Sequence, residues 1–180
     1  LEESSITIKE LVITANDKTK TINEMAIVSA RTFDVDEANR YAGSRGDPAR
    51  MAACFAGTQS TDDSRNDLVI RGNSPLGLLW RIQDVDIPNP NHFSAQGATG
   101  GPISMLNNNI LGNSDFLTGA FPAEYGNKTA AVFDIKLRNG NNEQNEYTGS
   151  LGINGIEIGA EGPISKKNGS SYLINYRYST

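Results

Sequence analysis

Apolar and polar residues alternate most regularly at the end of the chain. Residues 171–178 follow the period of two that is typical of a β-strand, in which successive side chains point to opposite faces. Residues 146–160 indicate one long strand before it, and residues 166–170 indicate the turn between the two. The pattern therefore predicts a long hairpin, and one face of its second strand carries Tyr172, Ile174, Tyr176 and Tyr178.

Helix signals occur earlier in the chain. Asp34 can cap a helix that runs through Ala42. Pro48 takes the first position of a second helix, which ends before Gly57. A third helix is predicted over residues 103–110, because a proline precedes it and a glycine follows it. The inward face of the second helix is expected to hold Ala52, Phe55 and Ala56.

Shorter strands are predicted between and after these helices, at residues 67–71, 78–82, 85–87, 115–117 and 131–138. The second and third form a hairpin that turns at Gln83-Asp84, and the lack of glycine there argues against a type I′ turn. The last strand is expected to face inward with Ala131, Phe133, Ile135 and Leu137. Short helices interleaved with antiparallel hairpins predict a protein of the α+β class.

Composition narrows the functional classes. A chain of 180 residues is long enough for one domain with a core of its own. The net charge of -5 and the pI of about 4.9 argue against nucleic acid as a partner, because binding to phosphates requires a basic surface. The single cysteine, Cys54, excludes an internal disulfide.

Candidate chemistry is sparse. The only histidine, His92, lies in a predicted loop, so the spacings of histidine and cysteine that hold zinc are absent from the sequence. The acidic run at residues 62–67 lacks the spacing of a calcium loop, and the glycines at 97–101 are not followed by a phosphate-binding lysine. We therefore expect no catalytic residue, no metal site, no cofactor and no enzymatic activity. Cys54, Phe55 and Trp80 are expected in the core.

Several segments resemble motifs of one protein family. Residues 67–72 resemble its Ile-Arg-Gly strand, and residues 80–88 resemble the hairpin that follows, which usually turns at Asp-Gly. Residues 116–119 resemble a strand that usually ends in Arg-Gly, and here Thr118 replaces the arginine. Residues 123–135 resemble its closing segment, with alanines in place of paired glycines. Near the start, an extended run resembles the TonB box: Glu10, Leu11, Val12, Ile13, Thr14 and Ala15.

The order and spacing of these motifs resemble the plug domain of TonB-dependent outer-membrane receptors, in particular Bacteroidetes-type receptors. The resemblance implies four parts: a remnant of a preceding β-domain or linker at 1–9, a TonB-box-like segment at 10–15, the plug at 16–140, and the truncated first barrel strands at 141–180. It implies a small mixed sheet with short helices, followed by a hairpin from the start of a transmembrane β-barrel. Aromatic-rich alternation is typical of such barrel walls.

The resemblance implies a gate for nutrient uptake in the cell outer membrane, with the plug in the barrel lumen and the N-terminus facing the periplasm. The implied partners are a TonB-type periplasmic energy-coupling protein, the chain's own C-terminal β-barrel, a surface lipoprotein and a nutrient ligand such as a glycan, siderophore or cobalamin. Residues 10–15 would add as a strand to the coupling protein, while Arg71 and Glu124 would contact the barrel.

A second reading is a non-enzymatic β-rich binding or adhesion module of a bacterial surface protein, whose last strands complete a sandwich. In the barrel reading, the last hairpin lacks the strands that would pair with its edges. Because open apolar strand edges recruit other strands, we expect this hairpin to exchange between molecules or to fold back on its own domain.

Overall fold

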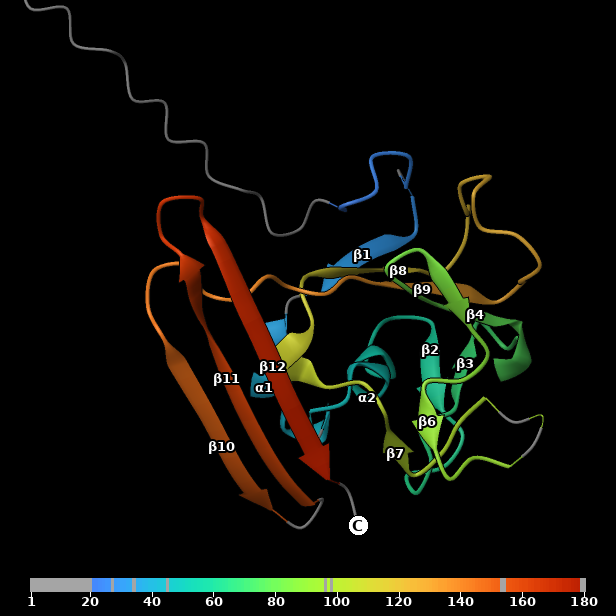
Figure 1. The fold of residues 1–180 in the computed structure, drawn as a ribbon. Coiled ribbons are helices and arrows are strands. Elements are labelled where there is room, and N and C mark those ends of the chain that lie inside the picture. Colours follow the sequence, from blue (N-terminus) through green and yellow to red (C-terminus); the bar gives the residue numbers. More distant parts are fainter. Residues whose placement is uncertain are drawn as a thin grey trace, which may run out of the picture.

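The computed structural model describes residues 21–178, apart from residues 27, 34, 45, 96, 98, 153 and 154. The predicted coupling segment, Glu10 to Ala15, and the predicted remnant at 1–9 lie outside the described residues. A five-stranded mixed sheet forms the centre of the molecule, and a three-stranded sheet stands beside it (Figure 1). Among the described residues, no helix is long and apolar enough to cross a membrane.

The five-stranded sheet has the order β1-β8-β9-β4-β5. Its strands β4 and β9 pair in parallel and its other neighbours pair antiparallel, which makes it the mixed sheet that the resemblance implied. Two hairpin-like pairs, β2-β3 and β6-β7, lie outside it. The bounds of the strands are β1 (Ala30–Phe33), β2 (Thr58–Ser60), β3 (Leu68–Ile70), β4 (Leu78–Ile82), β5 (Val85–Ile87), β6 (Asn91–His92), β7 (Ile103–Ser104), β8 (Ser114–Leu117) and β9 (Ala131–Ile135).

Two short α-helices occupy the predicted places, α1 (Val35–Arg40) and α2 (Pro48–Ala52). Asp47 caps α2, because its carboxylate accepts a hydrogen bond of 2.9 Å from the Ala49 N–H. Since α2 ends at Ala52, Ala56 is exposed and was wrongly expected in the core. Three 3₁₀ turns complete the helical elements: η1 (Ala42–Ser44), η2 (Pro75–Gly77) and η3 (Asn108–Ile110).

The helix predicted over residues 103–110 does not form. The chain instead makes strand β7 and then η3. Polar side chains there bond to the nearby backbone: the Ser104 hydroxyl accepts from the Leu106 N–H at 3.1 Å, and the Asn107 amide oxygen accepts from the Asn109 N–H at 2.9 Å. Such local bonds compete with the hydrogen bonds of a helix, so they favour turns.

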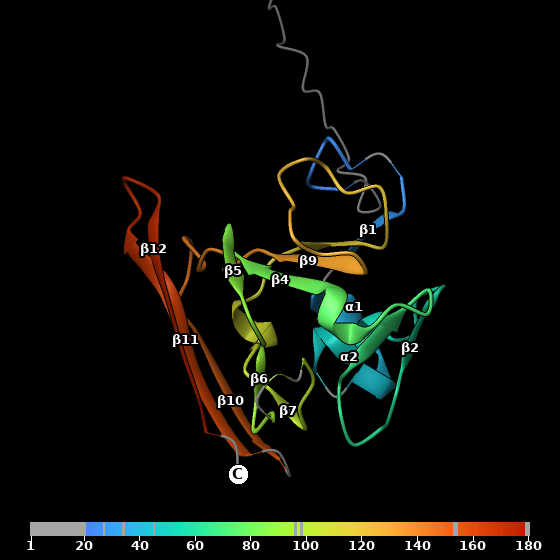
Figure 2. The same cartoon turned by 90° about the vertical axis from the view of Figure 1, so that its right-hand side faces the viewer.

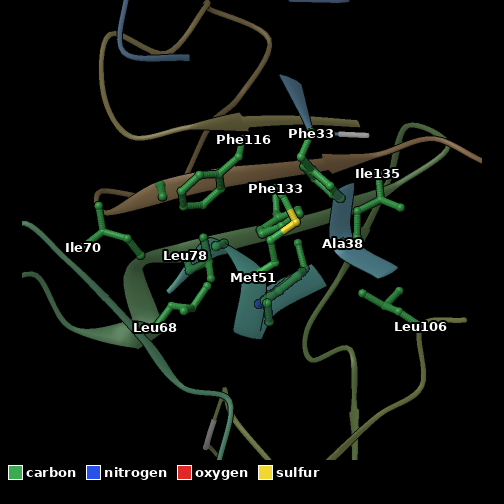
Figure 3. Packing of buried hydrophobic residues seen from close by; sticks show 14 of the residues in the cluster. Phe33, Ala38, Met51, Leu68, Ile70, Leu78, Leu106, Phe116, Phe133 and Ile135 are labelled. Atoms are coloured by element: carbon green, nitrogen blue, oxygen red, sulfur yellow. The ribbon is translucent and has the colours of Figure 1, made fainter. Parts of the chain in front are cut away.

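The central strand β9 is covered on both faces of the sheet, so all five of its residues are buried. The predicted inward face is confirmed for Ala131, Phe133 and Ile135, which all belong to the larger hydrophobic cluster. Leu137 was wrongly expected inward, because it lies beyond the end of the strand and is 41% exposed. One face belongs to the larger hydrophobic cluster (Figure 3), with Phe33, Met51, Trp80, Phe116 and Phe133. The other face carries a smaller cluster that consists of Ala26, Leu79, Leu117, Tyr125 and Val132.

Phe133 lies at the centre of the aromatic packing. Its ring stacks on Trp80 from β4, with ring centroids 4.8 Å apart and an interplanar angle of 13°. It also contacts Phe116 from β8 at 4.9 Å and the edge of Phe33 from β1 at 5.1 Å. Because each aromatic pair adds about 0.5–1.5 kcal/mol to the effect of burial, Phe133 joins four strands of the sheet strongly.

The β4-β5 hairpin turns at Gln83-Asp84 through positive φ angles of 47° and 66°. Two consecutive positive φ values define a type I′ turn, so the prediction made from the missing glycine was wrong. Contacts from β9 and the residue after it hold this turn. The Gln83 N–H donates to the Ile135 carbonyl at 3.0 Å, and Lys136 Nζ lies 2.7 Å from the Asp84 carboxylate.

The three-stranded sheet consists of β10 (Glu146–Gly152), β11 (Gly155–Ser165) and β12 (Ser170–Tyr178). The β11-β12 hairpin and its turn are confirmed. The single strand predicted at 146–160 is wrong, because the chain reverses between Gly152 and Gly155, which pair with each other. Gly155 has a φ of 123°, a conformation that residues with a side chain rarely adopt.

We predict that Phe133→Ala lowers the free energy of unfolding by about 3–5 kcal/mol, because it leaves a cavity where four strands meet. Phe93→Ala is the matched control, since Phe93 is 75% exposed and its loss is expected to cost less than about 0.5 kcal/mol. Urea unfolding followed by circular dichroism measures both. Equal losses for the two variants would contradict the central role of Phe133.

Candidate functional site

The three-stranded sheet is amphipathic. We call β10–β12 the flanking sheet and residues 21–140 the core domain. The strand register places Glu157, Glu161, Asn175 and Arg177 on one face of the flanking sheet, its polar face. The opposite, apolar face is exposed and carries three of the four residues that the sequence assigned to one side, Ile174, Tyr176 and Tyr178. Tyr172, the fourth, is half-buried. The exposed neighbours on this face are Tyr147, Leu151, Ile156 and Ile158.

The polar face meets the core domain, and Figure 2 shows the flanking sheet standing along one side of it. A bidentate ion pair joins Arg138 to Glu161, with nitrogen–oxygen distances of 2.6 and 2.7 Å. Glu161 is buried and also accepts from the Asn141 N–H at 2.9 Å. The hydrogen bonds from Arg138 hold the pKa of Glu161 below its usual range.

Arginine and asparagine side chains make the other contacts of this interface. Arg177 donates to the backbone carbonyl of Leu106 at 3.0 Å and to that of Ser104. The Asn107 amide donates to the Asn175 amide oxygen at 2.6 Å. Polar hydrogen bonds therefore dominate these contacts between the flanking sheet and the core domain, and water can replace such bonds at modest cost.

Arg71 lies at the surface just after β3, with a positive φ of 51°. Its guanidinium donates to the hydroxyls of Ser29 at 3.2 Å and Thr118 at 3.3 Å. Thr118 stands where the resembling family usually has a second arginine, so the structure places Arg71 next to that position. Its described hydrogen-bond partners are hydroxyls, which leaves the exposed guanidinium available to a carboxylate outside the chain.

Glu124, the second predicted contact residue, does not share a partner with Arg71 among the described residues. It accepts from the Asn23 side chain at 2.5 Å and lies 3.6 Å from Arg81. Its side chain is 44% exposed. Glu124 therefore belongs to a different cluster, which includes Asn23 and Arg81.

That cluster is built on a row of polar residues across the sheet. Strand pairing aligns Thr32 with Asp115, Asp115 with Asp134, and Asp134 with Arg81. Asp115 and Asp134 are 2% and 6% exposed. No motif marks this row in the sequence: Asp134 stands between two apolar residues of one predicted strand, and Asp115 is the first residue of another.

Tyr125 covers this row. Its hydroxyl donates to the Asp134 carboxylate at 2.8 Å and accepts from the Asn23 amide at 3.1 Å. Burial raises the pKa of the Tyr125 hydroxyl, which therefore stays protonated at neutral pH and remains a donor. Lys136 Nζ lies 3.4 Å from the second oxygen of Asp134 and compensates its charge.

Asp115 holds the beginning of the described chain. Its carboxylate accepts from the backbone N–H of Ile22 at 3.1 Å and of Asn23 at 2.8 Å. The Thr32 hydroxyl is a third donor, at 2.6 Å. A cavity of ≈ 250 Å³ lies next to these groups, lined by residues that include Ile22, Asn23, Glu124 and Lys136.

The residues considered for chemistry are dispersed. His92 is exposed in β6, and Trp80 is buried as expected. Cys54 is exposed and was wrongly expected in the core, because α2 ends before it and the chain turns outward. Phe55 is half-buried against the core. In the described part of the chain, no group of three or more His, Cys, Asp or Glu side chains is arranged to hold a metal ion.

The fold is similar to that of two bacterial receptors. A mutant of the ferric enterobactin receptor from Pseudomonas aeruginosa matches with a TM-score of 0.54 and 16% identity, over 82% of this chain and 24% of that chain. The siderophore receptor PirA from Acinetobacter baumannii matches with a TM-score of 0.57 and 16% identity, over 83% of this chain and 24% of that chain. No protein-family model and no curated protein matches the sequence.

This chain therefore spans about a quarter of the length of either receptor. Its fold is that of the plug-type domain of TonB-dependent receptors, as the sequence motifs indicated.

We predict that Glu161→Gln costs about 1–3 kcal/mol at pH 7, because it leaves the Arg138 guanidinium without its anion. The folded pKa of Glu161 lies below its ordinary value of 4.5, so this contribution is present above pH 4.5 and is lost as the pH falls through the folded pKa. The variant should therefore lose less stability than the parent over that acid range. Urea unfolding at several pH values tests this.

Glu37→Gln is the matched control. Glu37 pairs with Arg31 at 2.9 Å, but both side chains are about half exposed, so the expected cost is about 0–1 kcal/mol. The interface role of Glu161 is wrong if the two variants lose the same stability and follow the parent's pH dependence.

Proposed function

We propose that this chain is the plug, with the first wall strands, of a TonB-dependent outer-membrane receptor that gates the uptake of a nutrient. The observation that carries the proposal is the orientation of the flanking sheet. A plug-type fold meets its polar face, and its apolar face points away. In a transmembrane barrel the lumen side of the wall is polar and the lipid side is apolar. The role is a transport role and involves no catalysis.

The physical chemistry of the interface suits a gate. A large barrel leaves an open lumen, which a folded domain has to block. Contacts such as Arg138–Glu161 can hold that domain against the wall. Because these contacts are hydrogen bonds and ion pairs, water can satisfy the same groups when the plug moves. The hydrophobic core stays within the plug, so the plug can shift without exposing much apolar surface.

The energy for this movement would come through the segment Glu10 to Ala15. An extended segment can add as a strand to the sheet edge of a periplasmic coupling protein of the TonB type. In this proposal the N-terminus faces the periplasm, the remainder of the barrel is supplied by the same polypeptide, and a surface lipoprotein assists capture of the nutrient. The two similar receptors are named for siderophores, whereas glycans and cobalamin are further substrates that the proposal leaves to be tested.

We predict that Val12→Pro in the full-length receptor abolishes energised uptake and leaves ligand binding at the cell surface intact. Proline lacks the N–H that a strand ladder needs, so it prevents strand addition. The control is Val12→Thr, which keeps the N–H and the β-branched side chain. Uptake and surface binding of the labelled nutrient are measured in the same cells, and normal uptake by Val12→Pro contradicts the coupling role.

We also predict that Arg71→Ala raises passive leakage through the receptor. Its exposed guanidinium would otherwise pair with carboxylates of the barrel wall, as the family resemblance implies. Permeability to a large antibiotic is the measurement, and Arg40→Ala, which removes an exposed arginine from α1, is the control. Unchanged permeability in Arg71→Ala contradicts the contact.

If the chain is instead an adhesion module, the expected results for Val12→Pro and Arg71→Ala are the opposite. Its binding would continue without an energy source, and neither Val12→Pro nor Arg71→Ala would affect passage of solutes across the outer membrane.

A further inference from the structure

One buried carboxylate attaches the beginning of the described chain to the sheet. Asp115, in β8, accepts hydrogen bonds from two consecutive backbone N–H groups, those of Ile22 and Asn23, at 3.1 and 2.8 Å. The Asn23 side chain adds bonds to Glu124 and Tyr125. Strand pairing begins only later, at Ala30 in β1. The segment before β1 is therefore held at its start by two backbone N–H bonds to Asp115, in its middle by the buried side chain of Ala26, and at its end by the bond from the Thr118 N–H to the Ser29 carbonyl.

This attachment is strong while it is closed. Asp115 is 2% exposed, so water competes little for its hydrogen bonds. Hydrogen bonds to an ionised acceptor are about twice as strong as those between neutral groups. Among the described residues, Asp115 makes no ion pair with a lysine or arginine, and the backbone N–H groups of Ile22 and Asn23 together with the Thr32 hydroxyl stabilise its charge.

Water can stabilise the open arrangement. The neighbouring cavity of ≈ 250 Å³, which Ile22 and Asn23 help to line, would admit water to the carboxylate when the segment leaves. Hydration would then replace the lost N–H donors. The closed and open arrangements are therefore two distinct states.

The position of Asp115 along the chain gives it a mechanical role under the proposed function, on which this inference rests. Among the described residues, the first sheet contacts on the path from residues 10–15 are those of Ile22 and Asn23 with Asp115. Only afterwards would a pull load the Thr118 N–H bond to Ser29, of 2.8 Å, and then β1. Strand β1 holds more firmly, because Phe33 is 1% exposed and its ring packs against Phe133 on the other face of the sheet.

We propose that Asp115 is a clasp that opens first when the N-terminal segment is pulled, and that it frees residues 22–29 while β1, β8, β9 and β4 stay paired. The freed length is about 27 Å at full extension, since each residue spans at most about 3.3–3.6 Å. Asp115 would thus set the force at which coupling energy begins to remodel the plug.

Magnetic-tweezers measurements on the whole 180-residue chain test the clasp. Cys54→Ser removes the exposed thiol, and Val85→Cys, at a 63% exposed position in β5, provides one handle on the five-stranded sheet itself, with the other at residue 1. We expect an early step of up to about 27 Å before any larger unfolding event. Asp115→Asn should open about tenfold faster or more at a given force, because the amide offers one neutral acceptor oxygen. Asp63→Asn, in an exposed loop, should open at the parent's rate.

A second pair of variants leaves the sheet untouched. Ile22→Pro removes one of the two N–H donors, whereas Ile22→Ala keeps it and removes only a side chain that is 48% exposed. We expect faster opening for the proline variant and the parent's rate for the alanine variant. This pair decides the question alone if Asp115→Asn does not fold. Opening at the parent's rate in Ile22→Pro and in any folded Asp115→Asn overturns the clasp.

The result of the force measurement does not depend on whether the proposed function is correct. The force response of the isolated chain requires no partner, so a failed clasp leaves the plug assignment standing. Normal uptake by Val12→Pro would remove the pulling partner and would leave the measured opening step unchanged.

Discussion

The burial of β9 on both faces is the constraint on which the rest of the structure depends. A strand in the middle of the sheet that is covered on both sides has to supply apolar side chains in both directions, and β9 does so with Phe133 on one face and Val132 on the other. Its neighbours β4 and β8 follow the same register, which places Trp80 and Phe116 beside Phe133. Ala38 of α1, Met51 of α2 and Ile70 of β3 all belong to the hydrophobic cluster on one face of this layer.

The two faces of the sheet differ in chemistry. The aromatic face is apolar throughout its centre and gives the core domain most of its stability. The opposite face begins with apolar residues but continues into the row of Asp115, Asp134 and Arg81. Buried charges of this kind add little stability, because desolvation offsets much of their attraction. Their use is geometric: they hold Tyr125 and the segment around Asn23 in one arrangement through directed hydrogen bonds.

Strong and weak contacts are thus separated in space. Loss of a buried aromatic side chain costs about 3–5 kcal/mol, whereas each polar contact to the flanking sheet contributes about 0.5–3 kcal/mol and can be replaced by water. A domain built in this way can move as a unit against the flanking sheet before its own core opens. This separation fits the proposed function, in which the domain stays folded while it changes its position in the lumen.

The sequence by itself determined the features that depend on local pattern. The alternation at 171–178 predicted the faces of β12, the proline at 48 predicted the start of α2, and the motif at 67–72 led to the fold that the similar receptors share. Tertiary structure decided the features that depend on which strands pair and on which elements pack over the sheet. Packing on the second face of the sheet decided that Val132 and Asp134 are buried as well. Contacts from Lys136 hold a type I′ turn without glycine, and strand register made Asp115 the acceptor for a segment 92 residues away. No local pattern encodes these outcomes, because each requires two distant parts of the chain to meet.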